Sequence, residues 1–330
     1  MTSLRSGYDA LLLDLDGTLY QGAQAIPGAV EALARGDQRL YYVTNNASRS
    51  PESVSTHLTE LGFDSDPSRV VTSSQSAARL LSETVDRGSA VLVVGTDALC
   101  DEIAHVGLRP VRRFEDDPVA VVQGHSVATG WEMLAEATLA IRGGARWVAT
   151  NVDTTLPTER GLTLGNGSMV AAVATASGRE PLVAGKPAEP IMQDALTRSG
   201  AQRPLVVGDR LDTDIEGANA VGIDSLLVLS GVSTVAEVLR APASQRPTFI
   251  GRELAVLDED VDDVRVAGAE AWNVTFDGSD LVVESAGDAA DERDVDLVRA
   301  LAHVAWKYPE FGGIVPADPP VRVLLERWGL

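Results

Sequence analysis

Short apolar runs alternate with helix-like segments along most of this chain, and that alternation limits the possible folds more than any other feature. Within residues 8–74 the order is strand, helix, strand, helix, strand, and the same alternation returns from Pro187 to Gly251. Parallel strands need a long crossover between them, usually a helix. The pattern therefore predicts an α/β fold with a doubly wound, Rossmann-like parallel-sheet core built from residues 1–75 and 183–252.

The chain of 330 residues leaves room for two further units. Residues 76–182 carry their own strand and helix pattern, which is too long for a loop and predicts an inserted α/β cap domain. Residues 253–330 hold 18 Asp and Glu against 6 Lys and Arg, and we expect a small acidic α+β unit there. It should contain a hairpin over WNVTFDG and DLVVES and a helix over 294–310. Its role stays open.

The charge balance narrows the choice of partners. With 27 Lys and Arg against 48 Asp and Glu, the formal net charge is −21, which disfavours nucleic acid and anionic membrane surfaces. No apolar run reaches 18 residues, and because Asp14 and Asp16 interrupt the first apolar run, we expect no secretory signal in it. Cys100 is the only cysteine, so an internal disulfide or a cysteine zinc site is excluded. We expect a cytoplasmic protein, and a homo-oligomer stays open.

Acidic residues follow two of the predicted strands. Asp14 and Asp16 end the first strand, in DLDGTLY, while Asp209, Asp212 and Asp214 follow PLVV in GDRLDTDI. Ligands of open α/β sheets bind at the carboxyl ends of strands, and carboxylates gathered there favour Mg²⁺. Two acids at one strand end need not do the same job, so one can attack while the other handles protons. We expect Asp209 to bind the metal and Asp214 to act through water, whereas Asp212 faces solvent or caps a helix.

Two more strand ends carry polar side chains. Thr44 and Asn45 follow RLYYV and offer hydroxyl, amide and backbone donors, although such a pair also forms an ordinary capped turn. Lys186 is one of two lysines in a chain with 25 arginines, and it stands in a Gly-Lys-Pro turn. A compact ammonium there can neutralise a phosphate and keep a carboxylate ionised, the alternative being a surface lysine at a turn.

The four motifs DLDGTLY, VTNNAS, GKP and GDRLDTDI, in this order, resemble those of the haloacid dehalogenase superfamily phosphatases. The similarity covers residues 8–255 and is closest to the NagD-like, C2-capped branch, which includes glycerol 3-phosphate and phosphoglycolate phosphatases. It implies a Mg²⁺-dependent phosphomonoesterase, a phosphoric monoester hydrolase that works through an aspartyl-phosphate intermediate on Asp14.

The resemblance also implies a role for each motif residue. The metal would be held by Asp14, the main-chain carbonyl of Asp16 and Asp209, with Asp214 orienting a metal-bound water. Asp16 would protonate the leaving group and then take a proton from water. The phosphate oxygens would be held by Thr44, the amides around Asn45 and Lys186.

The substrate is less constrained than the reaction. Small phosphate monoesters are expected, with glycerol 3-phosphate first and phosphoglycolate second, while nucleotides and pyridoxal phosphate are alternatives. Candidates to touch the leaving group are Asn151, Asp153, Arg160 and Arg210, the last of which could instead be structural. The branch tends to read VVVGLD where this chain has VVQGHS, so His125 is a further candidate, although a lone histidine is more often structural. A different class of function, a phosphometabolite sensor or scaffold, also stays open.

Overall fold

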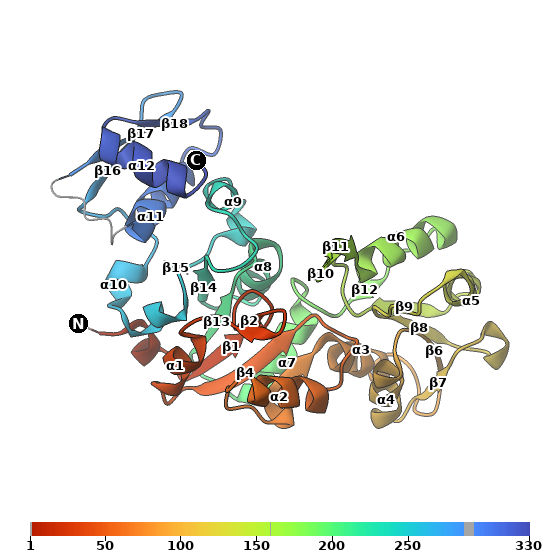
Figure 1. The fold of residues 1–330 in the computed structure, drawn as a ribbon. Coiled ribbons are helices and arrows are strands. Elements are labelled where there is room, and N and C mark those ends of the chain that lie inside the picture. The colour runs from red at the N-terminus through yellow and green to blue at the C-terminus, as the bar shows by residue number, and fades with distance from the viewer. Residues whose placement is uncertain (1, 159, 287–293) are drawn as a thin grey trace. The chain divides into compact units, whose positions relative to one another are not determined.

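The computed structural model describes residues 2–158, 160–286 and 294–330 (Figure 1). By its internal contacts the chain divides into two compact units. Unit 1 comprises residues 1–40 and 201–330, and unit 2 comprises residues 41–200. The sequence predicts a different division, into a core, a cap and a C-terminal unit, and those boundaries stay a prediction.

Unit 1 is organised around parallel strands from both ends of the α/β pattern. Strand β1 (Ala10–Leu13) pairs in parallel with β13 (Pro204–Gly208), with Leu11 opposite Leu205. Beyond β13 follow β14 (Ser225–Val228) and β15 (Phe249–Gly251), also parallel. All four strands are buried, as expected when both faces of a parallel sheet are covered. The two stretches separated in sequence therefore share one sheet, which confirms the predicted fold class.

Short helices and a hairpin complete this part of unit 1. Helix α9 begins with a capping box, in which the Thr234 hydroxyl accepts from the Glu237 amide and the Glu237 carboxylate accepts from Thr234. The elements are η1 (Leu4–Gly7), β2 (Tyr20–Gln21), β3 (Gln24–Ala25), α1 (Ala29–Ala34), η4 (Leu211–Ile215), α8 (Glu216–Ala220), α9 (Val235–Leu239), η5 (Ala243–Gln245), η6 (Leu254–Asp258) and α10 (Val261–Val264).

The C-terminal part of unit 1 contains the predicted hairpin and helix. Strands β16 (Trp272–Phe276) and β17 (Leu281–Ser285) are antiparallel, and β18 (Ile314–Pro316) pairs in parallel with β17. Helices α11 (Asp294–Ala305) and α12 (Pro319–Arg327) pack on this sheet. One hydrophobic cluster joins these elements to β14, β15, η4 and α9, so the C-terminal part shares its core with the rest of unit 1.

Unit 2 contains a second parallel sheet, whose strand order is β12-β9-β8-β6-β7. Helices α3 and α4 cover one face and α5 and α6 cover the other. The strands are β6 (Ala90–Val94), β7 (Arg109–Val111), β8 (Ala120–Gln123), β9 (Arg146–Ala149) and β12 (Leu182–Val183), and the helices are α3 (Ser73–Ser82), α4 (Asp97–His105), α5 (Trp131–Arg142) and α6 (Asn166–Ser177).

Unit 2 also holds most of β4 (Arg39–Thr44), which pairs in parallel with β5 (Val70–Thr72). Helix α2 begins after Ser50, whose hydroxyl accepts from the Ser53 amide. The remaining elements are α2 (Pro51–Glu60), η2 (Pro67–Arg69), η3 (Phe114–Asp116), the hairpin β10 (Thr155–Thr158) and β11 (Gly161–Leu164), and α7 (Glu189–Ser199). Among the described residues, the helices are all too short or too polar to cross a bilayer.

Candidate active site

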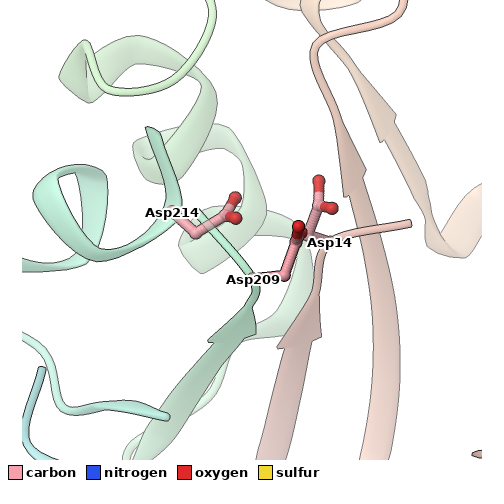
Figure 2. A group of neighbouring side chains, drawn as sticks. All are labelled: Asp14, Asp209 and Asp214. Carbon is pink, nitrogen blue, oxygen red and sulfur yellow. The ribbon is translucent and has the colours of Figure 1, made fainter. Parts of the chain in front are cut away.

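Three carboxylates gather at the ends of two neighbouring strands of unit 1 (Figure 2). Asp14 directly follows β1, Asp209 directly follows β13, and Asp214 lies in η4, the turn of π-helix that comes next. Because β1 and β13 run in parallel, their carboxyl ends lie at one edge of the sheet. One oxygen from each side chain lies within 4.8 Å of the others. We call these three residues the acid cluster.

Glycines allow the backbone to approach the acid cluster closely. Gly17 has φ +88°, in the left-handed region, and a β-carbon there would collide with the Asp209 carboxylate. A β-carbon at Gly231 would meet the same carboxylate, and one at Gly208 would meet Asp214. The carboxylates therefore lie in a tight setting that larger residues at these three positions would disrupt.

Asp209 is the most buried member of the cluster. Its side chain is 0% exposed, and its two oxygens accept hydrogen bonds from the Thr18 hydroxyl at 3.2 Å and the Val232 amide at 2.7 Å. Burial, followed by the negative charges of Asp14 and Asp214, raises the pKa of Asp209 to about 8. Three carboxylates this close oppose one another's ionisation, and a divalent cation would relieve that repulsion.

The donor set of the acid cluster fits a hard divalent cation. Mg²⁺ and Ca²⁺ take oxygen ligands, and Mg²⁺ is commonly held by one or two carboxylates with water and a substrate phosphate. Asp16 contributes no carboxylate to the cluster. Its side chain is exposed, and its Oδ2 accepts from the Tyr20 hydroxyl at 3.5 Å. Its predicted metal contact through the main-chain carbonyl stays a prediction.

In unit 2, Lys186 is buried and is held by the end of β4 and by Asn45, the residue that follows this strand. Its side chain is 3% exposed, and its ammonium donates to the Val43 carbonyl at 2.9 Å. The Lys186 amide donates to Asn45 Oδ1 at 2.8 Å, and the Lys186 carbonyl accepts from Asn45 Nδ2 at 2.9 Å. The alternative of a surface lysine is therefore wrong. We call Val43, Asn45 and Lys186 the lysine group.

Of the polar residues at the end of β4, Thr44 and Asn46 accept hydrogen bonds within the turn, whereas the Asn45 side chain makes long-range contacts. The Thr44 hydroxyl accepts from the Asn46 amide at 3.1 Å, which leaves its proton for donation. Asn46 Oδ1 accepts from the Ser48 amide at 2.8 Å, the capped turn that the sequence offered as an alternative for this segment. That turn uses Asn46, whereas the Asn45 side chain bonds to residues far away in the sequence.

Known proteins resemble every part of this chain. Residues 11–109 match the family described as haloacid dehalogenase-like hydrolase, residues 183–257 match a second hydrolase family of the same type, and residues 269–330 match the GCN5-related N-acetyltransferase-like domain. The D-glycerol 3-phosphate phosphatase of Mycobacterium tuberculosis is 50% identical over 340 residues, covering 100% of this chain and 96% of that protein. The chain belongs to the haloacid dehalogenase-like hydrolases.

A solved structure and a second relative extend the comparison. The glycerol phosphate phosphatase of Mycobacterium tuberculosis in complex with magnesium has a TM-score of 0.96 and 52% identity, covering 100% of this chain and 99% of that one. The acid sugar phosphatase of Staphylococcus aureus is 39% identical over 237 residues, 70% of this chain and 90% of that protein. This haloacid dehalogenase-like hydrolase is a phosphatase, which confirms the predicted family and enzyme class. The acetyltransferase-like match of its C-terminal part was not predicted.

The predicted leaving-group residues of this phosphatase have different surroundings. Both ends of the Asn151 side chain stabilise the loop: its Nδ2 donates to the Asn45 carbonyl at 2.7 Å and its Oδ1 accepts from the Asp153 amide at 3.3 Å. Asp153 accepts from Asn45 Nδ2. Arg160 is exposed at the turn of the β10–β11 hairpin. The Arg210 guanidinium donates two hydrogen bonds to Asp212. This contact agrees with the structural role expected from the sequence as the alternative for Arg210.

Several residues that support the site were not predicted. Ser73 Oγ donates to the Asn45 carbonyl at 2.7 Å, and Ser48 Oγ donates to the His125 carbonyl at 2.9 Å. His125 is half-buried, and burial lowers its pKa. Ser233 Oγ accepts from the Leu211 amide at 3.0 Å, beside the loop that donates to Asp209. The available signal was the run of small polar residues after each strand, which sequence patterns alone do not distinguish from ordinary turns.

Proposed function

We propose that this phosphatase hydrolyses small phosphate monoesters with Mg²⁺, using Asp14 as its nucleophile. The observation that carries the proposal is the acid cluster, which brings the Asp14 carboxylate within 4.8 Å of carboxylate oxygens of Asp209 and Asp214. Asp14 and Asp209 would hold the cation together with the main-chain carbonyl of Asp16, and Asp214 would orient a metal-bound water. Bound there, Mg²⁺ would offset negative charge on the phosphoryl oxygens. The relative solved with magnesium, at 52% identity, supports this choice of cation.

The chain's own residues supply the steps. The Asp14 carboxylate attacks phosphorus, the phosphorus–oxygen bond to the leaving group breaks, and the departing alkoxide takes a proton from Asp16. Water then attacks the phosphorus of the aspartyl phosphate and gives a proton to Asp16. This attack breaks the bond between phosphorus and Asp14, so phosphate is released and the Asp14 carboxylate is restored. Thr44, the backbone amides around Asn45 and the Lys186 ammonium hold the phosphoryl oxygens.

Glycerol 3-phosphate is the first substrate that we propose. The relative named for D-glycerol 3-phosphate matches this chain over its full length, including the C-terminal part. Phosphoglycolate stays the second candidate, and the relative named an acid sugar phosphatase, which matches 70% of the chain, adds sugar phosphates as a further one. Asp153 and Arg160 remain proposed contacts to the leaving group. We also propose that the enzyme works in the cytoplasm, since its single cysteine suits a reducing compartment.

A substrate panel with two matched variants tests the proposal. Purified protein with Mg²⁺ is assayed on glycerol 3-phosphate, phosphoglycolate, a sugar phosphate, a nucleotide and pyridoxal phosphate. We expect the highest kcat/KM on glycerol 3-phosphate and no turnover in Asp14→Asn. Asp212→Asn is the control, because Asp212 is an exposed acid of the same loop as Asp214 and pairs with Arg210. Phosphate binding without turnover in the wild-type protein would instead favour the sensor.

A further inference from the structure

Asn45 makes an unusual set of contacts with Lys186, which is 141 residues away in the sequence. The side-chain Oδ1 accepts from the Lys186 amide at 2.8 Å, and the side-chain Nδ2 donates to the Lys186 carbonyl at 2.9 Å. One side-chain amide therefore satisfies both polar groups of the Lys186 main chain. Only Asn and Gln offer a donor and an acceptor in this arrangement, and Gln is longer by one methylene.

The lysine is held at its other end as well. Its ammonium donates to the Val43 carbonyl at 2.9 Å, two residues before Asn45. A β-carbon at Gly185 would be 2.5 Å from Asn45 Oδ1 and 2.5 Å from the Thr150 carbonyl oxygen, so a larger residue there would push Asn45 away. The segment 43–45 thus contacts the amide, the carbonyl and the ammonium of Lys186, which limits the positions the side chain can adopt.

Asn45 also contacts the loop that follows β9. Its Nδ2 lies 3.3 and 3.4 Å from the two carboxylate oxygens of Asp153, and its carbonyl accepts from Asn151 Nδ2 at 2.7 Å. The same carbonyl accepts from Ser73 Oγ at 2.7 Å. Three segments far apart in the sequence therefore meet at this one residue.

The charge pattern requires a neutral amide at this position. The Nδ2 group donates toward two acceptors, the Lys186 carbonyl and the Asp153 carboxylate. A carboxylate in place of the amide would put negative oxygen against both of them, and two negative groups in these part-buried contacts repel each other. An aliphatic side chain would leave the Lys186 amide and carbonyl without these partners.

We propose that the Asn45 side chain is a positioning residue: it orients Lys186 and links the position of that lysine to the Asp153 loop. This rests on the proposed function, in which Lys186 holds the phosphoryl oxygens. The Asn45 side chain is then not itself a phosphate ligand; any contact of this residue with phosphate is made by its main-chain amide. Movement of the Asp153 loop changes the set of acceptors around Nδ2, and through it the position of Lys186.

A double-mutant cycle separates positioning from independent binding. Turnover is measured with p-nitrophenyl phosphate and Mg²⁺ for wild type, Asn45→Ala, Lys186→Ala and the double variant. We expect losses in kcat of about 100-fold for Asn45→Ala and about 1,000-fold for Lys186→Ala. If Asn45 acts only through the lysine, the double variant is no slower than Lys186→Ala alone, so Lys186→Ala costs only about 10-fold in the Asn45→Ala background.

Each outcome has one meaning. Losses that multiply, to about 100,000-fold in the double variant, would show that Asn45 contributes independently and would overturn the proposal. An undiminished kcat in Lys186→Ala alone would refute the proposed role of the lysine itself, a failure of the proposed function that the cycle distinguishes. If Asn45→Ala does not fold by circular dichroism, the same cycle is run with Asn45→Ser.

A charge variant with a matched control adds a second readout. Asn45→Asp should lower kcat strongly, and pairing it with Asp153→Asn should restore part of that loss, because one of the two facing negative charges is removed. Ser50→Asp is the control: it adds the same charge five residues away and keeps the acceptor for the Ser53 amide at the start of α2. Equal losses in Asn45→Asp and Ser50→Asp, or an absence of rescue by Asp153→Asn, would contradict the proposal.

Discussion

The acid cluster and the lysine group are held in opposite ways. In the acid cluster, three carboxylates lie close together, and burial together with the repulsion between them raises the pKa of Asp209. In the lysine group, the charge of Lys186 is met by a carbonyl, and both polar groups of its main chain are paired with Asn45. The difference teaches that the acid cluster gathers like charges that a bound cation would offset, whereas the lysine group is built from hydrogen bonds within unit 2.

The largest effect is expected from breaking the acid cluster. Asp209→Asn removes a charged ligand for the cation, and we expect kcat to fall by about 1,000-fold. Chelation of divalent cations should abolish turnover of the wild-type enzyme, and Mg²⁺ should restore it. Steady-state kinetics with and without chelator, with Asp212→Asn as control, measure this. Full activity of Asp209→Asn would contradict the proposal that Asp209 binds a cation required for turnover.

The next effect concerns the lysine group. Lys186→Arg keeps the charge but places a larger, forked group in a 3% exposed site, so we expect kcat to fall by about 100-fold. Lys307→Arg is the matched control, since Lys307 is the other lysine of the chain and is less buried. Near wild-type kinetics in Lys186→Arg would show that a positive charge at this position is sufficient for turnover. The hydrogen bonds that fix the Lys186 side chain would then not be needed for catalysis.

A smaller effect links pH to the cation. The pKa of Asp209 in the folded protein is about 8, above the ordinary value of 3.8, so this group favours folding most at low pH and loses that contribution as the pH rises through 8. A bound cation compensates for the repulsion that then develops. We therefore expect Mg²⁺ to raise the Tm more at about pH 9 than at about pH 5. Equal rises at both pH values in thermal denaturation would contradict this assignment.

The smallest effect on turnover is expected from a substitution in the C-terminal part, which contains no residue of the acid cluster or of the lysine group. Leu301 is 0% exposed in the cluster that joins α11 to β14, β15 and α9. Leu301→Ala should lower the free energy of unfolding by about 2–5 kcal/mol and leave the kcat of the folded protein within about 3-fold. Val323→Ala, at a 56% exposed position of α12, is the control for denaturant titration. A loss of kcat as large as that of Lys186→Arg would assign this part a direct role in catalysis.

The strand ends were predictable because strand polarity determines where they lie. Once the apolar runs before Asp14 and Asp209 are read as parallel strands, their following residues must lie at one edge of a sheet, and the structure places them there. Lys186 was recognisable from its rarity among 25 arginines. Each of these inferences used a local pattern combined with one general rule of α/β folds.

The rest depended on contacts that no local pattern encodes. The Asn45 side chain meets Lys186 across 141 residues, and nothing near VTNNAS predicts that pairing. The sequence gives little signal for helix α6, because Asn166–Ser177 is rich in small and apolar residues on every side, which weakens a helical period. The predicted C-terminal unit does contain its hairpin and helix, but its core is continuous with that of unit 1, a feature that composition cannot reveal.

The central claim is that the Asp14 carboxylate is transiently esterified by the phosphoryl group. The direct measurement is to quench the enzyme with acid during turnover of glycerol 3-phosphate and to locate the added phosphoryl mass by peptide mass spectrometry. Our account predicts the adduct on the peptide that contains Asp14, and its loss in Asp14→Asn. An adduct on another residue, or product formation with no adduct at any time of quenching, would contradict it.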